Sequence, residues 1–246
     1  MTASAGVTGR LGAALLIAAG LAASGWLVGA GFVDSRLGVR SVTVKGLAER
    51  EVRADLAIWA LRFVATGNEL TTVREKVASD EAAVRKFVGQ GGLHDATVGV
   101  GGFEVTDALA QLYRSGPVES RFVMAQTLIV RSPDVDGIAA LAQRVGELVS
   151  QGVVLSSDGG TAGGPVYLFT ALNDAKPEMV AEATRNARAS AEQFAADSGS
   201  RLGDIRSASQ GLFQILARDD APGLMEPFQI AKRLRVVSTV EYFLTD

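Results

Sequence analysis

The sequence lacks cysteine altogether and contains a single histidine, His94, in 246 residues. The absence of cysteine excludes disulfide bonds, thiolate metal sites and thiol nucleophiles. A single histidine also excludes any mechanism that needs two imidazoles. Aromatic residues make up only 6% of the chain, and the formal net charge is −3. Proteins that bind nucleic acid by neutralising phosphates are normally basic, so this class is disfavoured and no nucleic-acid partner is expected.

Charge is also missing from one long segment near the start. Residues 11–33 read LGAALLIAAGLAASGWLVGAGFV, and these 23 positions carry no charged side chain. A helix needs about 20 apolar residues to cross a bilayer core. We therefore expect residues 1–33 to form an uncleaved signal anchor with a transmembrane helix, and residues 11–33 to contact the membrane. A cleaved signal peptide remains the alternative, because small residues such as Ala22-Ala23-Ser24 occur within the segment.

The rest of the chain, residues 34–246, has the composition of a folded domain. Over the whole sequence, apolar residues make up 48% and charged residues 21%, which is enough to build a packed core. Strand and helix signals alternate from residue 41 onward. The expected strands are 41–46, 51–64, 96–105, 121–131, 153–156, 165–171, 205–216 and 229–244, and the expected helices are about 68–90, 132–151 and 173–198. This order predicts an α+β fold of repeated strand-helix-strand units with antiparallel or mixed sheets.

Local signals refine three of these elements. The strand at 51–64 is apolar on both faces in its middle, which predicts a central strand covered on two sides. Asn68 and Ser132 are the expected N-caps of the first two helices. For the third helix we expect an inward stripe of mostly small residues: Met179, Val180, Ala183, Ala187, Ala191, Phe194 and Ala195.

Several segments resemble the SIMPL domain family of bacteria. Val42 to Phe63, VTVKGLAEREVRADLAIWALRF, resembles that family's first hairpin, with a strand, a turn at Gly46, and the stretch Arg53-Ala54-Asp55-Leu56-Ala57. Ala171 to Ser209 resembles its alanine-rich helix, followed by Leu202-Gly203-Asp204-Ile205 and a strand. Val236 to Leu244 resembles its final strand. The resemblance covers essentially all of 41–244, and the region Asp219 to Pro227 departs from it by being longer and richer in proline.

The resemblance implies a location and a mode of action but no reaction. Members of the family are typically exported to the periplasm or tethered there, and some self-assemble. It therefore implies a single-pass protein of the bacterial inner membrane with its domain in the periplasm, or a soluble periplasmic protein if the leader is cleaved. It also implies a homo-oligomer. The family supplies no catalytic, cofactor-binding or metal-binding residue, so we assign none and expect no cofactor.

Candidate acidic sites have simpler structural interpretations. His94 and Asp95 are adjacent, but the chain has no G-x-S-x-G elbow around a serine, so we expect them in a surface loop. Asp134 and Asp136 are spaced like the start of a calcium loop, yet helix capping explains both. Asp219-Asp220 is expected to be a solvated turn.

Candidate anion-binding segments also have simpler structural interpretations. Gly99-Val100-Gly101-Gly102 resembles a phosphate loop but lies within a strand, so we expect a bulge or bend. The glycine-rich loop at 157–164 is expected to be a connector, with a binding loop as the alternative. Lys232, Arg233 and Arg235 form the densest basic patch, for which we expect a solvated strand end.

The expected function is binding or homo-oligomeric assembly, related to the cell envelope or to stress. One alternative is a hydrolase that uses carboxylates such as Asp55 or Glu104, because carboxylate pairs can catalyse without histidine. The other alternative is an accessory protein that binds a small molecule in a groove.

Overall fold

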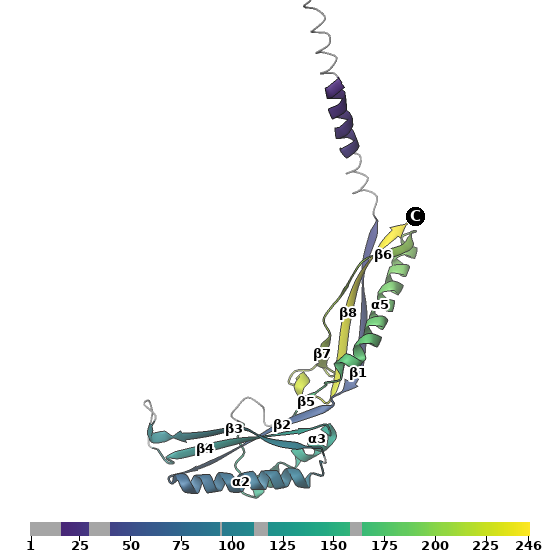
Figure 1. Cartoon of the computed structure of the whole chain (residues 1–246). Helices are drawn as coiled ribbons and strands as arrows, with labels where there is room; N and C mark the ends of the chain where they lie inside the picture. Colours follow the sequence, from purple (N-terminus) through teal and green to yellow (C-terminus); the bar gives the residue numbers. More distant parts are fainter. Residues whose placement is uncertain (1–15, 30–39, 94, 111–117, 158–163) are drawn as a thin grey trace, which may run out of the picture. The chain divides into compact units, whose positions relative to one another are not determined.

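The computed structural model describes residues 16–29, 40–93, 95–110, 118–157 and 164–246 (Figure 1). After a helix at 16–29, the elements follow in this order: β1 Ser41–Arg53, β2 Leu56–Gly67, α2 Leu70–Gln90, β3 Thr97–Asp107, η1 Ala108–Ala110, β4 Phe122–Ser132, α3 Val135–Gln143, α4 Gly146–Ser150, β5 Val166–Leu168, α5 Leu172–Asp197, β6 Arg201–Gln210, β7 Gln214–Ala217, η2 Glu226–Phe228 and β8 Ala231–Thr245. Antiparallel pairs join β2 to β4 and β5, β3 to β4, and both β6 and β7 to β8. The predicted α+β class with antiparallel sheets is confirmed.

The helix at 16–29 presents its large apolar side chains to the surroundings. Those side chains are between 64% and 79% exposed: Leu16, Ile17, Leu21, Trp26, Leu27 and Val28. The expected transmembrane segment at 11–33 extends beyond this helix, and its two ends lie outside the described residues. Among the residues described, no helix has both the length and the hydropathy needed to cross a bilayer.

The chain divides into two compact units that each combine separate stretches of sequence. The first unit comprises Met1–Leu47, Glu182–Gly211 and Val237–Asp246, and the second comprises Ala48–Ala181 and Leu212–Val236. The second unit contains a four-stranded sheet in the order β3-β4-β2-β5. The other sheet has the order β1-β8-β6, with β7 also paired to β8.

Helix α2 packs on one face of the β3-β4-β2-β5 sheet (Figure 1). Trp59 and Phe63 of β2 point to this face and are fully buried, as are Leu128 and Val130 of β4. The Trp59 ring meets that of Phe87 edge to face, with ring centroids 6.5 Å apart. Burial of such large apolar side chains supplies most of the free energy that holds the helix to the sheet.

The opposite face of this sheet is less covered, which corrects one expectation. We define the second face as Ile58, Ala60, Arg62, Thr127, Ile129 and Arg131, residues that alternate with the buried ones along β2 and β4. The first five are half-buried and Arg131 is exposed. The strand is central, as predicted, but only one of its faces is fully buried. Apolar character on both faces of a strand therefore did not indicate equal coverage here.

Gly46 does not end a strand, contrary to expectation. It is buried in the middle of β1, where α5 packs against the sheet (Figure 1). A Cβ at position 46 would overlap the carbonyl oxygen of Ala183 and the backbone nitrogen of Ala187, and would lie 2.8 Å from the Ala187 Cβ. The glycine is required because the helix backbone approaches the strand so closely.

The contacting face of α5 is made of alanine. We call Ala183, Ala187, Ala191 and Ala195 the alanine seam, since they recur every fourth residue and are at most 2% exposed. The inward stripe predicted for this helix is confirmed at these positions and at Met179. Phe194 was wrongly expected to face inward, because its side chain is 50% exposed.

The first two strands do not form a hairpin, contrary to the expected arrangement. β1 and β2 belong to different sheets, and the chain changes sheet at Ala54 and Asp55. Ala54 is buried and donates its backbone N–H to the carbonyl of Ile230 at 2.8 Å. The small apolar residue and the acid of the Arg53–Ala57 motif therefore mark a change of sheet instead of a turn.

Three further boundaries differ from expectation. The predicted strand at 205–216 is two strands, β6 and β7, separated at Gly211, whose N–H donates to the Val237 carbonyl. The predicted strand at 153–156 is a single bridge between Leu155 and Phe63. The predicted helix at 132–151 is two short helices, α3 and α4.

Candidate functional site

An ion pair crosses the second face of the β3-β4-β2-β5 sheet. Arg62 of β2 donates to the carboxylate of Glu104 of β3 at 2.9 Å, over the intervening strand β4. The Arg62 side chain is 20% exposed and that of Glu104 is 71% exposed. Glu104, a candidate catalytic acid, is thus held by a cation of its own sheet.

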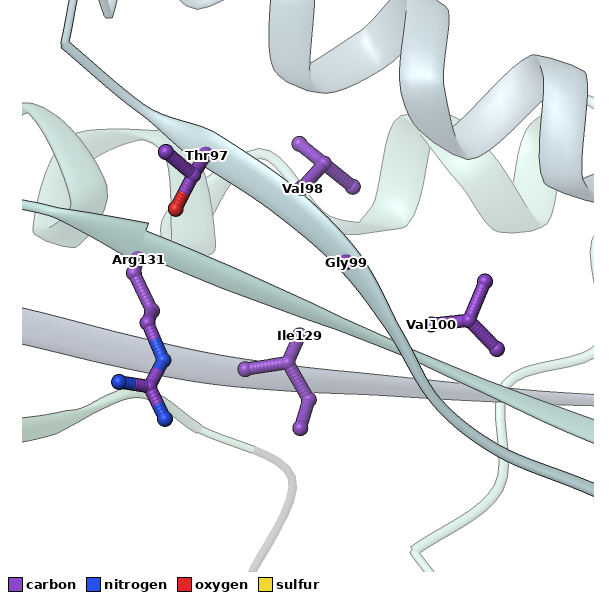
Figure 2. A pocket seen from close by; sticks show the side chains of 6 residues that line it. All are labelled: Thr97, Val98, Gly99, Val100, Ile129 and Arg131. Carbon is purple, nitrogen blue, oxygen red and sulfur yellow. The ribbon is translucent and has the colours of Figure 1, made fainter.

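An open depression of about 340 Å³ lies at the start of β3 and the end of β4. Thr97, Val98, Gly99, Val100, Ile129 and Arg131 line it (Figure 2). Ile129 and Arg131 lie side by side on the second face, and Gly99, which has no side chain, is opposite Ile129 on β3 (Figure 2). Arg131 forms no ion pair with any residue in the described ranges. The arrangement can offer one guanidinium and one hydroxyl next to apolar surface.

A second depression, of about 220 Å³, is lined by Ala60, Leu61, Arg62, Val145, Leu155, Ser156 and Ser157. Two hydroxyls and a guanidinium are its polar groups. Neither depression has a carboxylate, imidazole or thiol among the described residues that line it.

Asp55, the other candidate catalytic acid, has a structural role. Its carboxylate accepts backbone N–H bonds from Thr170 at 2.8 and 3.0 Å, and from Ala171 at 2.9 Å. These two residues immediately precede α5, whose first residue is Leu172. The acid of the family motif therefore fixes the entry into the long helix, and the structure gives Asp55 and Glu104 different partners.

The acids at the start of α3 confirm a capping role for one of the pair. Asp134 is the N-cap, and its side chain accepts from the Gly137 N–H at 2.8 Å. Asp136 instead forms an ion pair with Arg53 at 2.7 Å. Within the described residues, no group of three or more acidic, histidine or cysteine side chains is placed to hold a metal ion.

Asn68 does not cap the first helix as predicted. The N-cap of α2 is Glu69, whose side chain makes no capping bond. The Asn68 side chain accepts from the backbone N–H of Arg121 at 3.0 Å, where β4 begins.

Some candidates lie outside the described residues. His94 is one of these, and so are residues 158–163, the centre of the loop at 157–164. Asp95 is described and lies exposed in a turn just before β3. The predictions for the histidine and for the centre of the loop stay predictions.

The glycine cluster forms the expected bulge. The register of β3 against β4 shifts between Val100 and Gly102. A Cβ on Gly101 would lie 2.7 Å from two side-chain carbons of Ile129, so the bulge brings the β3 backbone close to β4.

The basic patch was predicted wrongly at one of its three positions. Lys232 is not solvated: it is 0% exposed, and its Nζ donates to the carbonyl of Glu226 at 2.8 Å and to the carboxylate of the same residue. Arg233 donates to the carbonyl of Arg218 at 2.7 Å, and Arg235 lies 3.6 Å from a carboxylate oxygen of Glu49. These cations hold neighbouring segments of the protein.

The turn that contains Asp219 is held in place by its neighbours. Asp219 pairs with Arg218 at 2.7 Å, and this contact lowers the pKa of the Asp219 carboxyl. Gln229 bonds to the backbone N–H and carbonyl of Asp219. The expectation of an exposed turn is confirmed, and its conformation is specified by these bonds.

One polar cluster was missed from the sequence. Glu241 of β8 accepts from the Ser41 hydroxyl at 2.7 Å, from Arg206 at 2.9 Å and from the Ser207 hydroxyl at 3.2 Å. The Ser41 bond is the main cause of a lowered pKa for the Glu241 carboxyl, with Ser207 and Arg206 adding to it. Ser41 belongs to β1, and Arg206 and Ser207 are neighbours on β6; both strands lie far from Glu241 in the sequence, so no local spacing could have indicated the cluster.

Comparison with known proteins identifies a family. The family model SIMPL, a protein of unknown function (DUF541), matches residues 42–241. No curated protein matches the chain. The match covers both sheets, the motif around Asp55 and the helix that carries the alanine seam. The chain therefore belongs to the SIMPL family.

Proposed function

We propose that this protein is tethered to the bacterial inner membrane by its N-terminal segment, with residues 34–246 in the periplasm. In this proposal the protein acts by binding or by homo-oligomeric assembly, in the envelope or under envelope stress, rather than by catalysis. The observation that carries the proposal is the helix at 16–29, whose large apolar side chains are 64% to 79% exposed.

The tether is supported by the cost of leaving that helix in water. Apolar surface in water costs about 25 cal/mol per Å², so six large exposed side chains on one short helix favour a nonaqueous environment. The charge-free run at 11–33 is long enough in sequence to cross a bilayer core as a helix. The periplasmic orientation rests on the resemblance to the SIMPL family, which implies a periplasmic or periplasm-tethered domain.

Assembly in place of catalysis is supported by the roles of the acids. Asp55 is occupied with the backbone before α5, and Glu104 is occupied with Arg62. Within the described residues both sheets end in strands that pair on one side only, and such edges supply a means of association because they pair readily with other strands.

Fractionation of cells that produce the full chain tests the tether. The intact protein should remain with membranes after a carbonate wash, and protease added to spheroplasts should digest it. The double variant Leu21→Arg/Leu27→Arg should leave the membrane fraction, since each arginine near the centre of a span costs about 2.5–3.5 kcal/mol. Leu212→Arg is the matched control, because Leu212 is 89% exposed but lies outside the N-terminal segment. The Leu212→Arg protein should stay in the membrane fraction.

Two results would overturn the tether: release of the intact wild-type chain by carbonate, or resistance to protease in spheroplasts when lysed cells are sensitive. N-terminal sequencing of the mature protein separates an anchor from a cleaved leader. Mass photometry of the detergent-extracted protein tests assembly, and a strict monomer at micromolar concentration would contradict it.

A second candidate function is the binding of a small anionic ligand at Arg131. The depression beside Arg131 is favoured because its guanidinium lies next to apolar surface and a threonine hydroxyl. A carboxylate-bearing metabolite should raise the melting temperature of the wild type but not of Arg131→Gln. A flat response of the wild type across a broad metabolite set would remove this candidate.

A further inference from the structure

Strand β3 is the terminal strand of its sheet and offers one long edge. The sheet order β3-β4-β2-β5 leaves β3 bonded to β4 alone, and among the described residues no strand pairs with its other edge. Arg85 donates to the carbonyl of Val98 at 3.3 Å, so the stretch available to a partner begins after that residue. Unpaired backbone groups along such an edge are a template for another strand.

The edge of β3 is less protected than the edges of β1 and β6, the other long edge strands of the described sheets. Proteins normally blunt an edge with charged side chains. β1 carries five charged residues in 13 positions and β6 carries three in 10, whereas β3 carries two in 11. β6 also has two register shifts against its neighbour, while β3 has one.

Apolar side chains project from β3 into solvent. Val100 is 59% exposed, Phe103 is 53% and Val105 is 49%. Their registered neighbours on β4 are Leu128, Gln126 and Met124, which face the helix side of the sheet, so the three share one face. By contrast, β1 has one exposed large apolar side chain, Leu47, and β6 has one, Ile205.

The two charges on β3 are already neutralised within the same chain. Glu104 pairs with Arg62 at 2.9 Å, and Asp107 pairs with Arg121 at 3.0 Å. Hydrogen bonding from Arg121 also lowers the pKa of the Asp107 carboxyl, which keeps that pair charged. A second β3 placed alongside would therefore meet two neutralised acids instead of two bare like charges.

The glycines of β3 also suit close approach by another backbone. Nothing lies within 4 Å of the position that a Cβ on Gly99 or Gly102 would take. Glycine within a strand often marks a place where a second backbone comes near.

We propose that two copies of this chain associate by antiparallel pairing of their β3 edges, which joins two sheets into one and covers Val100, Phe103 and Val105 of each copy with those of the other. A second copy is the occupant that the edge fits best. It brings an identical apolar row, an identical free edge and acids neutralised in the same way, as an isologous twofold interface requires. The inference rests on the proposed self-assembly and names its interface.

Single-cysteine variants of the full chain test the pairing directly. The wild type contains no cysteine, so any disulfide reports the introduced residue alone. Residues opposite one another in antiparallel strands have Cα atoms about 4.5–5.5 Å apart, a separation that a disulfide can bridge. Under mild oxidation in detergent, at least one of Val100→Cys, Phe103→Cys and Val105→Cys should give a covalent dimer. Val149→Cys, on α4 and 58% exposed, should give none.

Lysine variants supply the second measurement, by mass photometry and sedimentation of the full-length protein. Val100→Lys and Phe103→Lys should each raise the concentration at which the protein assembles by about tenfold or more, because they place like charges across the edge and remove apolar cover. Val149→Lys and Phe194→Lys are matched controls with 58% and 50% exposure, and both should assemble like the wild type. Circular dichroism confirms that each variant is folded.

The outcomes separate the two proposals. Assembly of the wild type together with β3 variants that behave like their controls would overturn the β3 interface and leave self-assembly standing. A wild type that stays monomeric at micromolar concentration would overturn self-assembly itself. Cross-linking at β3 together with dissociation by the lysine variants would support both.

Discussion

The carboxylate of Asp55 accepts the backbone N–H of Thr170 at 2.8 Å, across 115 positions of sequence. The N–H of Ala171 also donates to this carboxylate, at 2.9 Å. The acid thus ties the point where the chain leaves β1 to the point where α5 begins.

Loss of this carboxylate should therefore destabilise the fold. Asp55→Ala leaves two backbone N–H groups without their acceptor, and we expect a loss of about 1–3 kcal/mol in the free energy of unfolding. Asp55→Asn retains one acceptor oxygen and should lose less. Urea denaturation followed by circular dichroism measures both, with Asp95→Ala in an exposed turn as the control. Equal stability of Asp55→Ala and wild type would contradict the structural role.

Replacement of Gly46 by alanine should be costly because the helix backbone leaves no room. The new methyl group would overlap backbone atoms of Ala183 and Ala187, which cannot move without shifting α5. We expect the free energy of unfolding to fall by about 1–3 kcal/mol, the range found for overpacked cores. Gly99→Ala is the matched control in another strand, where nothing lies within 4 Å of the new Cβ. Thermal melting of both variants gives the comparison, and similar melting temperatures would refute the close approach.

The stability of the fold should depend on the pairing of buried Lys232 with Glu226. Removal of one partner of a buried pair typically costs about 3–5 kcal/mol, and Glu226 is 31% exposed, so its replacement should lie at or below the lower end. Glu226→Gln should destabilise the protein, and the double variant Glu226→Gln/Lys232→Met should recover part of the loss because no unpaired charge remains. Chemical denaturation of the two variants tests this order. A double variant less stable than Glu226→Gln would contradict it.

The Glu241 cluster predicts a dependence of stability on pH. The folded protein lowers the pKa of Glu241 below its ordinary value of 4.5, so the ionised form stabilises the fold. That contribution is present above the unfolded pKa and is lost as the pH falls through the folded pKa. The melting temperature of Glu241→Gln should be below that of wild type at pH 7, and the difference should shrink below about pH 4.5. A difference that is constant from pH 7 to pH 3 would show that ionisation of Glu241 is irrelevant.

Local patterns in the sequence predicted the parts of the fold that depend on local physics. The alanine spacing of α5 follows from helical periodicity, and the bulge at Gly99–Gly102 follows from glycine within a strand. Most strands and helices were predicted at approximately the right residues because they too depend on local patterns of apolar and polar residues.

Contacts across long sequence distances account for the errors. Gly46 was predicted to form a turn. The actual reason for a glycine at this position is the close approach of the α5 backbone near Ala183, which lies far along the chain. Lys232 was predicted to be solvated because lysine is seldom fully buried. Its pairing with Glu226 depends on the folded structure and could not be predicted from the sequence. The structural role of Asp55 depends in the same way on Thr170.

The alanine seam links evolutionary change at positions that no local rule would connect. A bulkier residue at Ala183 or Ala187 would push the helix outward, and the same displacement would make space for a side chain at Gly46. Substitutions at these sites are therefore expected to occur together in distant SIMPL sequences, with small residues retained jointly or exchanged jointly. Relatives that keep small side chains at all of these positions would be those in which the helix lies at this short distance from the sheet.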